Sequence, residues 1–373
     1  MDPIIAATHA DPYPYYAQLR AQGGLMFHQG LKLWVVSSAK AVAAVLAHPD
    51  CHVRPTHEPV PKAIASGMAG KVFSQLMRMN EGERQRCPRS AIQPALALID
   101  VEEVNALVGA RLLSPDAEGL HKAMFLGPVC VVAALLGFSP AQARVISELT
   151  GDFVACLSPL SDQAQLDAAH AAAEQLSGYF IELLDDPDNQ SALLAGIRQR
   201  FAASSDTDAM IANLVGLLSQ TYEATAGLIG NALLALIRNP QWLNDSINID
   251  DLVAEAQRFD PSVQNTRRFV AAPCEIEGVA LNTGDVILVL LASANRDPAL
   301  NENPDHFMVD RPNRRSFTFG SGRHQCPGQM LAMTIASATL TEILARDIDP
   351  GRLAWHYRPS LNGRIPMFSE MQT

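Results

Sequence analysis

The chain has 373 residues, of which 48% are hydrophobic and 18% are charged, and its mean hydropathy is +0.06. A net charge of −11 argues against a nucleic-acid surface, and six cysteines without a CxxC pair argue against a disulfide framework or a structural zinc site. No apolar stretch approaches the roughly 20 charge-free residues of a membrane span, and the N-terminus lacks the basic start of a signal peptide. We therefore expect a soluble, cytoplasmic protein.

Residue periodicity predicts a mainly α architecture with a minor β-sheet region, and the absence of repeats and long linkers predicts a single domain over residues 1–373. In chain order the predicted elements are a helix at 11–21, a strand at 31–36, a helix at 38–47, a loop at 53–76, helices at 117–136, 163–184, 208–238 and 249–259, a strand–turn–strand segment at 274–297 and a helix at 329–345. The helix at 208–238 is roughly 45 Å long at 1.5 Å per residue, enough to cross a domain.

The segment FTFGSGRHQCPGQMLA, residues 317–332, places one cysteine among three glycines directly before a predicted helix. Glycines permit positive φ, and Pro327 suits a first helical position. The N–H groups and the dipole at a helix start favour a thiolate at Cys326, and a thiolate can ligate a metal. Arg323 and His324 offer positive or hydrogen-bonding groups to nearby carboxylates. From these residues alone, a structural cysteine in a turn and half of a zinc site are the alternatives.

The longer pattern is more specific. Read as F-G-x-G-x-H-x-C-x-G, it consists of Phe319, Gly320, Gly322, His324, Cys326 and Gly328. It resembles the haem-thiolate loop of the bacterial cytochrome P-450 family, although Met333 stands where relatives commonly have arginine. The resemblance implies that Cys326 is the axial ligand of the iron of haem b, within a cofactor-binding loop that includes Phe319, Gly320 and Gly328. Thiolate donation favours O–O cleavage.

Other segments extend the resemblance over nearly the whole chain. Glu255 and Arg258 match the family's E-x-x-R on a helix, at the i, i+3 spacing that allows an ion pair, and this implies a structural role. The resemblance also implies that Arg268 contacts a haem propionate, with a strand-edge arginine as the alternative. His324 resembles the second propionate partner.

The family's H-x-x-x-R motif is altered in the segment NEGERQRCPRSAI, residues 80–92. Arg84 and Pro88 occupy the two motif positions. We expect Arg84 to reach a propionate, with Arg89, one residue beyond the second position, as another candidate; a solvated arginine is the alternative for both. Pro88 predicts that a helix begins or kinks there.

The long helix departs from the family where relatives carry A-G-x-E-T-T. The acid is kept as Glu223, but Gln220 and Thr221 replace the small pair and Ala224 replaces the usual threonine. Oxygen activation needs delivered protons, normally through a hydroxyl and ordered water. Either a substrate hydroxyl or water replaces the missing group, or Gln220, Thr221 or Thr225 holds the water, or the enzyme does not perform ordinary oxygen-driven hydroxylation.

The resemblance implies a monooxygenase that inserts one oxygen atom from O₂ into a small organic, secondary-metabolite-type substrate. Electrons are expected from a separate ferredoxin and an NAD(P)H-dependent reductase, without a nucleic-acid partner, a membrane span or an oligomeric partner. A peroxide-driven or non-hydroxylating haem-thiolate enzyme, such as an isomerase or coupling oxidase, and a non-catalytic haem-binding protein are the alternatives. Substrate contacts are expected from residues 53–76, 217–225, 264–265 and 361–364. A basic group that either docks the ferredoxin or is merely solvated consists of Arg311, Arg314, Arg315 and Arg323.

Overall fold

The computed structural model describes residues 1–110, 116–201, 206–243, 247–346 and 352–370. The chain forms two compact units, each assembled from separate stretches of sequence. The first unit consists of Met1–His57, Gly227–Cys326 and Ile348–Thr373, and the second of Glu58–Ala226 and Pro327–Asp347. The long helix passes from the second unit into the first after Ala226.

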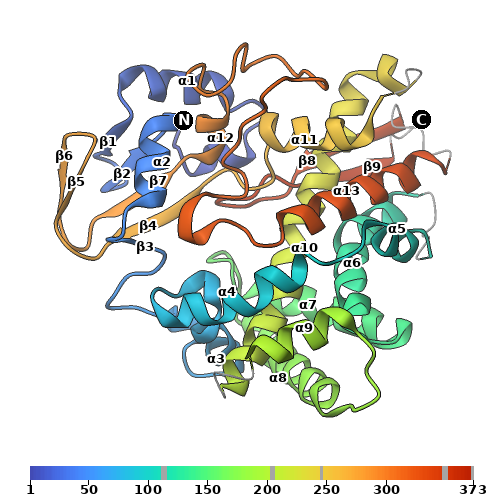
Figure 1. Cartoon of the computed structure of the whole chain (residues 1–373). Helices are drawn as coiled ribbons and strands as arrows, with labels where there is room; N and C mark the ends of the chain where they lie inside the picture. Colours follow the sequence, from blue (N-terminus) through green and yellow to red (C-terminus); the bar gives the residue numbers. More distant parts are fainter. Residues whose placement is uncertain (111–115, 202–205, 244–246, 347–351, 371–373) are drawn as a thin grey trace. The chain divides into compact units, whose positions relative to one another are not determined.

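The first unit is built on a five-stranded sheet with the strand order β1-β2-β7-β4-β3 (Figure 1). Strands β2 and β7 pair in parallel, and the other neighbours in this sheet pair antiparallel. Two further two-stranded sheets are β5-β6 and β8-β9. The strands are β1 Leu25–His28, β2 Leu33–Val36, β3 Cys51–His52, β4 Thr266–Val270, β5 Cys274–Ile276, β6 Val279–Leu281, β7 Val286–Val289, β8 Leu353–Tyr357 and β9 Pro366–Glu370.

Both faces of the five-stranded sheet are buried at the adjacent strands β2 and β7. Side chains alternate along a strand, so Val35 and Leu288 pack with helix α1 whereas Val36 and Val289 pack with helix α2. Two-sided burial explains why LWVV and VILV are continuous apolar runs. The helices of this unit are η1 Ile5–Thr8, α1 Tyr13–Gln22, α2 Ala39–Ala47, η4 Pro240–Leu243, α11 Ile249–Phe259, α12 Leu291–Asn295 and η5 Gly322–His324.

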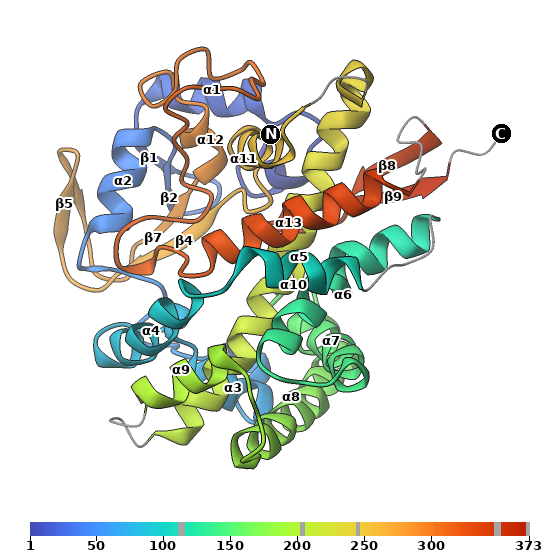
Figure 2. The ribbon, with the colours of Figure 1, turned by 45° about the vertical axis from the view of Figure 1, so that its right-hand side comes forward.

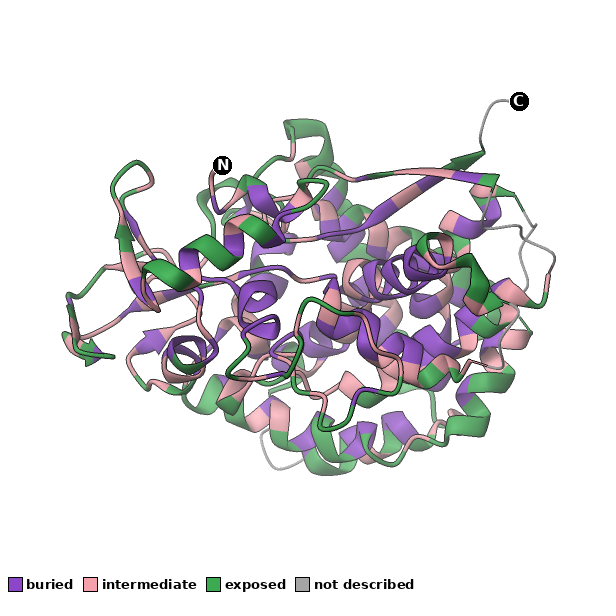
Figure 3. Cartoon of the chain, turned by 90° about the horizontal axis from the view of Figure 1, so that it is seen from above, coloured by how far each residue is buried: buried purple, intermediate pink, exposed green. Residues whose placement is uncertain are grey.

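The second unit is helical in its described residues. Its core gathers apolar side chains from most of these helices and from the first half of α10, and the buried and exposed faces of the helices are shown in Figure 3. Helix α13 packs beside α5 (Figure 2). The helices are η2 Lys62–Ile64, α3 Met68–Gln75, η3 Met77–Met79, α4 Glu83–Leu96, α5 Val101–Gly109, α6 Ala117–Leu135, α7 Pro140–Ala155, α8 Gln163–Asp185, α9 Ala192–Phe201, α10 Thr207–Arg238 and α13 Gln329–Leu344.

Most predicted elements are confirmed, but several differ. The segment 274–297 was expected to form a strand, a turn and a second strand, yet it contains β5, β6, β7 and helix α12. The segment 53–76 was expected to be a loop, yet it contains η2 and α3. Gly70 lies inside α3. A Cβ at this position would meet the carbonyl oxygen of Ile64 at 2.1 Å, so the close approach of the two backbone segments requires glycine. Helix α4 does not begin at Pro88: it begins at Glu83, and both Pro88 and Pro94 lie inside it.

Among the described residues, one helix meets the length and composition of a membrane span, although no such segment was expected from the sequence. This is α6, whose apolar window is 56% buried inside the structure. Leu120, Met124 and Val132 belong to the core of the second unit. The helix also carries Glu118 and Lys122. A buried core helix has these features, so α6 is weak evidence for a membrane span.

Candidate functional site

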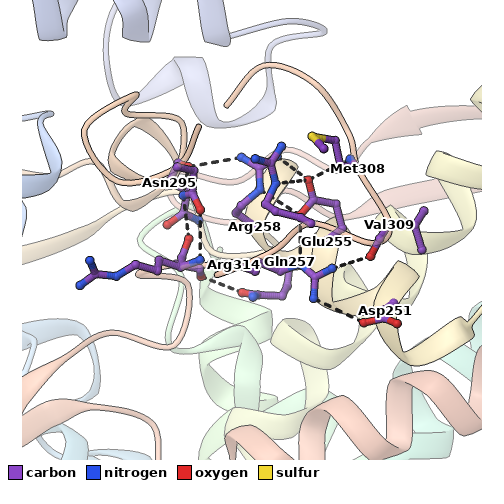
Figure 4. Close-up of polar contacts among 12 residues, drawn as sticks. Asp251, Glu255, Gln257, Arg258, Asn295, Met308, Val309 and Arg314 are labelled. Atoms are coloured by element: carbon purple, nitrogen blue, oxygen red, sulfur yellow. Dashed lines mark hydrogen bonds and ion pairs between the residues drawn. The ribbon is translucent and has the colours of Figure 1, made fainter. Parts of the chain in front are cut away.

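A buried carboxylate on α11 organises the segment that leads into the cysteine loop. Arg258 binds Glu255 in a bidentate manner, with Nη2–Oε1 and Nε–Oε2 distances of 2.6 and 3.0 Å, and both side chains are fully buried (Figure 4). Burial opposes ionisation of Glu255, but the hydrogen bonds and charge of Arg258 and then of Arg311 hold its pKa below the usual value. The structural role expected for Glu255 and Arg258 follows from this geometry.

Two further arginines, which the sequence places in a basic group near the loop, complete this cluster. Arg311 Nε lies 2.9 Å from Glu255 Oε1, and Arg314 Nε lies 3.1 Å from Oε2. Arg323 donates to the carbonyl oxygens of His48, Pro49 and Cys51.

The predicted basic docking group is therefore wrong as a group. Arg311 is 7% exposed. Three of the four arginines in the group, Arg311, Arg314 and Arg323, bind other residues of the first unit. Only Arg315 in this set is exposed. The sequence carried no signal for this outcome, because the partners of the arginines lie far away along the chain.

Two polar side chains fix the strand-like segment before the loop. Asn295 Oδ1 accepts from the Phe317 N–H at 2.6 Å, and its Nδ2 donates to Thr318 Oγ1 at 2.9 Å. Thr318 Oγ1 also donates to the Gln257 carbonyl oxygen. Figure 4 shows Asn295 and Gln257 within this network of polar contacts. The helix with the E-x-x-R motif thus holds the chain that enters the cysteine loop.

The loop itself turns sharply and brings Cys326 back beside its own start. The Cys326 N–H donates to Phe319 O at 2.8 Å, and the Gly320 N–H donates to Phe317 O at 2.7 Å. Gly320 and Gly322 have φ of +70° and +68°, which other residues adopt only with strain. No residue from Phe319 to Cys326 is buried. Helix α13 starts three residues after Cys326, with Gly328 as its N-cap.

Three of the other cysteines lie in environments that disfavour a thiolate. Burial raises the pKa of both Cys51 and Cys156 to about 12, and it also raises the pKa of Cys274. Such groups stay protonated and make poor metal ligands at neutral pH. Cys326 is half-buried and stands just before a helix start, which favours ligand chemistry.

In the first half of α10, Met210, Leu217 and residues 220–224 are half-buried, and the other residues from 209 to 226 are buried. Leu217, Gln220, Thr221 and Ala224 are half-buried and recur at three- and four-residue steps, so they share a face. Gln220 Nε2 donates to Gly216 O at 2.9 Å, and Thr221 Oγ1 donates to Leu217 O at 2.8 Å. These four residues form the half-buried stripe of α10.

Two predicted distal residues lie outside that stripe. Thr225 is 2% exposed, about 100° further round the helix than Ala224. Glu223 is half-buried and lies within electrostatic range of Arg78, a residue that the sequence analysis did not select. Tyr222 packs on Phe125 with ring centroids 5.3 Å apart, and a Cβ on Gly151 would meet its hydroxyl at 2.8 Å.

The residues expected at the haem propionates occupy two elements of the first unit and one of the second. Arg268 is 6% exposed on β4, with Nη1 donating to the Arg267 carbonyl oxygen at 2.8 Å. His324 is half-buried at the end of η5, in the cysteine loop. On α4, Arg84 is exposed and Arg89 is half-buried. The loop brings His324 and Cys326 together in sequence and space.

These residues fit a haem. An accessible cysteine at a helix start supplies a thiolate, glycines with positive φ shape its loop, and cationic side chains are available for carboxylates. Within the described ranges no group of three or more His, Cys, Asp or Glu side chains is placed to hold a metal ion. Cys326 is thus the ligand candidate with the strongest structural support.

The chain belongs to the cytochrome P450 family. The family model described as Cytochrome P450 matches residues 249–346, which contain the α11 cluster and the whole cysteine loop. The cytochrome P450 monooxygenase PikC of Streptomyces venezuelae is 31% identical, over 95% of this chain and 89% of the relative. The enzyme class expected from the sequence, a cytochrome P450 monooxygenase, is confirmed by these matches.

Two further comparisons agree. The 20-oxo-5-O-mycaminosyltylactone 23-monooxygenase of Streptomyces fradiae is 26% identical, over 92% of this chain and 84% of the relative. The crystal structure of CalO2 superposes with a TM-score of 0.84 and 22% identity, covering 100% of this chain and 98% of the other. At that identity the likeness shows the fold alone, which confirms the mainly α cytochrome P450 architecture.

Proposed function

We propose that this protein binds haem b through Cys326 and inserts one oxygen atom from O₂ into a small organic substrate of the secondary-metabolite type. The observation that carries the proposal is the half-buried Cys326 in a glycine-shaped turn that runs into α13. When bound, a thiolate-ligated haem supplies O–O cleavage. The match to PikC runs over 95% of the chain, which supports one P450 domain over residues 1–373.

The chain's own residues have the following proposed roles. Arg268 and His324 hold the haem propionates, with Arg84 or Arg89 as additional partners, because cations pair with carboxylates through charge-assisted hydrogen bonds. Phe319, Gly320 and Gly328 shape the loop around Cys326. Electrons come from a separate ferredoxin and reductase. The names of the Streptomyces relatives support the substrate class and not an individual substrate.

Proton delivery at the distal face is proposed to use an ordered water or a substrate hydroxyl beside Ala224. The single proton of the Thr221 hydroxyl is donated to Leu217 O, so this side chain accepts rather than donates toward the site. Thr225 is buried. Gln220 keeps its Oε1 as an acceptor, since its Nε2 is bound to Gly216 O. Gln220 and Thr221 therefore position a water, and Glu223 supplies the acid.

The absorption spectrum of the reduced, carbon-monoxide-bound protein tests the proposal. The wild type should show the strongly red-shifted Soret band of thiolate ligation, and Cys326→Ser should lose it. The matched control is Cys87→Ser, a half-buried cysteine on α4, which should leave the band unchanged. A colourless wild type in the presence of haem, or a full Soret signature in Cys326→Ser, would refute the proposal.

Ala224 favours one alternative function, a peroxide-driven or non-hydroxylating haem-thiolate enzyme, because it lacks the hydroxyl that usually delivers protons. Consumption measurements separate the two. An oxygenase consumes O₂ and electrons in proportion to product, whereas a peroxide-driven enzyme forms product with peroxide alone. A haem-binding protein without turnover does neither.

A further inference from the structure

Arg78 lies on a rigid turn beside the distal helix. It is the middle residue of η3, the single turn between α3 and α4. The Asn213 side chain on α10 makes two hydrogen bonds at the start of this turn. Its Oδ1 accepts from the Met77 N–H at 2.7 Å, and its Nδ2 donates to the Gln75 carbonyl oxygen at 2.9 Å. Asn80 donates to the Leu76 carbonyl oxygen at 2.8 Å. The backbone that carries Arg78 is thus fixed to α10 before any ligand binds.

The guanidinium of Arg78 has no partner among the described residues. Its Nε is buried without a hydrogen bond, and no hydrogen bond or ion pair joins the side chain to the described protein. Two other deep arginines are paired with carboxylates: Arg258 binds Glu255, and Arg364 binds Asp260 at 2.6 Å. An unpaired charge taken out of water is costly, so a buried arginine without a counter-ion indicates a missing anion.

The protein groups near Arg78 do not fully neutralise it. Burial lowers the pKa of Arg78, and the charges of Cys156 and Glu223 act in the opposite direction. Cys156, however, has a pKa raised to about 12 by burial and is a neutral thiol at neutral pH. Glu223 is near enough to Arg78 to interact with it electrostatically, and its charge offsets part of the cost of burying Arg78.

The position of Arg78 relates it to the substrate side of the site. Glu223 directly precedes Ala224, a member of the half-buried stripe of α10, and Cys156 caps the C-terminus of α7. Arg78 is half-buried as a residue although its Nε is fully buried, so part of its side chain borders accessible space. The turn also follows directly on residues 53–76, from which substrate contacts are expected.

We propose that Arg78 determines substrate specificity by binding a carboxylate of the substrate next to the distal face of α10. The inference rests on the proposed function, because it assigns a substrate class to the same site. A haem propionate carries the same chemical group. The substrate is favoured as its source, because Arg78 lies by the distal acid Glu223 and is far from the cysteine loop in the sequence.

The test uses ligands whose binding does not require knowledge of the substrate. ω-(Imidazol-1-yl)alkanoic acids of graded chain length bind haem iron through the imidazole, and their methyl esters provide uncharged matches. In the wild type, at least one chain length should bind about 10- to 100-fold more tightly as the acid than as the ester, since a hydrogen bond to a charged group contributes about 1.5–3 kcal/mol.

Two variants and one control locate the effect. Arg78→Gln should abolish the preference for the acid, and Arg78→Lys should retain part of it, because a single ammonium replaces the bidentate fork. The control is Arg144→Gln, an exposed arginine on α7, which should keep the full preference. An equal affinity for acids and esters at every chain length in the wild type, or a preference that survives Arg78→Gln, overturns the proposal.

Two further measurements exclude other roles. The rate of haem transfer to apomyoglobin should be unchanged in Arg78→Gln; faster transfer would assign Arg78 to a propionate and overturn the proposal. Arg78→Met should leave the unfolding midpoint of the ligand-free protein unchanged or raised, because it removes an uncompensated charge. A loss of stability as large as that of a broken ion pair would overturn the proposal by showing a structural role.

The Soret test separates the two levels of inference. If the thiolate band is absent, the proposed function fails. If the band is present and the acid preference is absent, only the role of Arg78 fails.

Discussion

The charge cluster around Glu255 gives the largest expected effect of a single conservative substitution. Glu255→Gln removes one buried negative charge and keeps nearly the same volume. The carboxylate accepts from Arg258, Arg311 and Arg314 and from the Met308 N–H, at distances between 2.6 and 3.1 Å. After the substitution three guanidinium groups face each other at a neutral amide, and the two most buried, Arg258 and Arg311, are 0% and 7% exposed.

Breaking a buried ion pair from one side costs about 3–5 kcal/mol, because the remaining charge stays buried without compensation. A protein of ordinary stability has only about 5–15 kcal/mol to lose. We therefore expect Glu255→Gln to lower the free energy of unfolding by about 3–5 kcal/mol. The cysteine loop should loosen as well, since Arg311 and Arg314 fix the segment that leads into it.

Urea unfolding followed by circular dichroism measures this loss as a shift of the midpoint at unchanged slope. The matched control is Glu118→Gln, which breaks an exposed i, i+4 pair with Lys122 and should cost about 0.5 kcal/mol or less. A loss below about 1 kcal/mol in Glu255→Gln would refute the reasoning. It would show that water or a shifted side chain compensates the arginines.

Three further predictions concern the rest of the site and its support. Burial opposes ionisation of Asp260, yet Arg364 holds the pKa of this carboxyl below its usual value, so the stabilisation from the carboxylate is present above about pH 4 and is lost as the pH falls through the folded-state pKa. Asp260→Asn should therefore lower the free energy of unfolding at pH 7 and flatten its decline toward acid pH. An unchanged acid slope in unfolding curves would contradict this. Ala224→Thr should raise the ratio of product to released peroxide if proton delivery limits coupling, whereas an unchanged ratio would show that another group already serves. Gly320→Ala should cost about 1 kcal/mol or more because φ is +70° there, and a neutral effect on haem retention and unfolding would refute the need for glycine.

The sequence determined the local features of this protein. Periodicity placed α10 and α11 to within a residue, because each helix buries a continuous apolar face that repeats with the helical period. The cysteine-loop pattern identified the family for a similar reason. Positive φ at Gly320 and Gly322 and a helix start after Cys326 are requirements of consecutive residues, so they are visible in consecutive letters.

Only the tertiary structure decided the partners of the charged residues. Arg311 and Arg314 looked like a basic surface next to the loop, but they bind Glu255, which lies more than fifty positions earlier in the chain. Arg78 did not stand out at all, because its lack of a partner is a property of its surroundings and not of its neighbours in sequence. A charge tells how strongly a side chain needs a partner, whereas the path of the chain in space decides whether one is there.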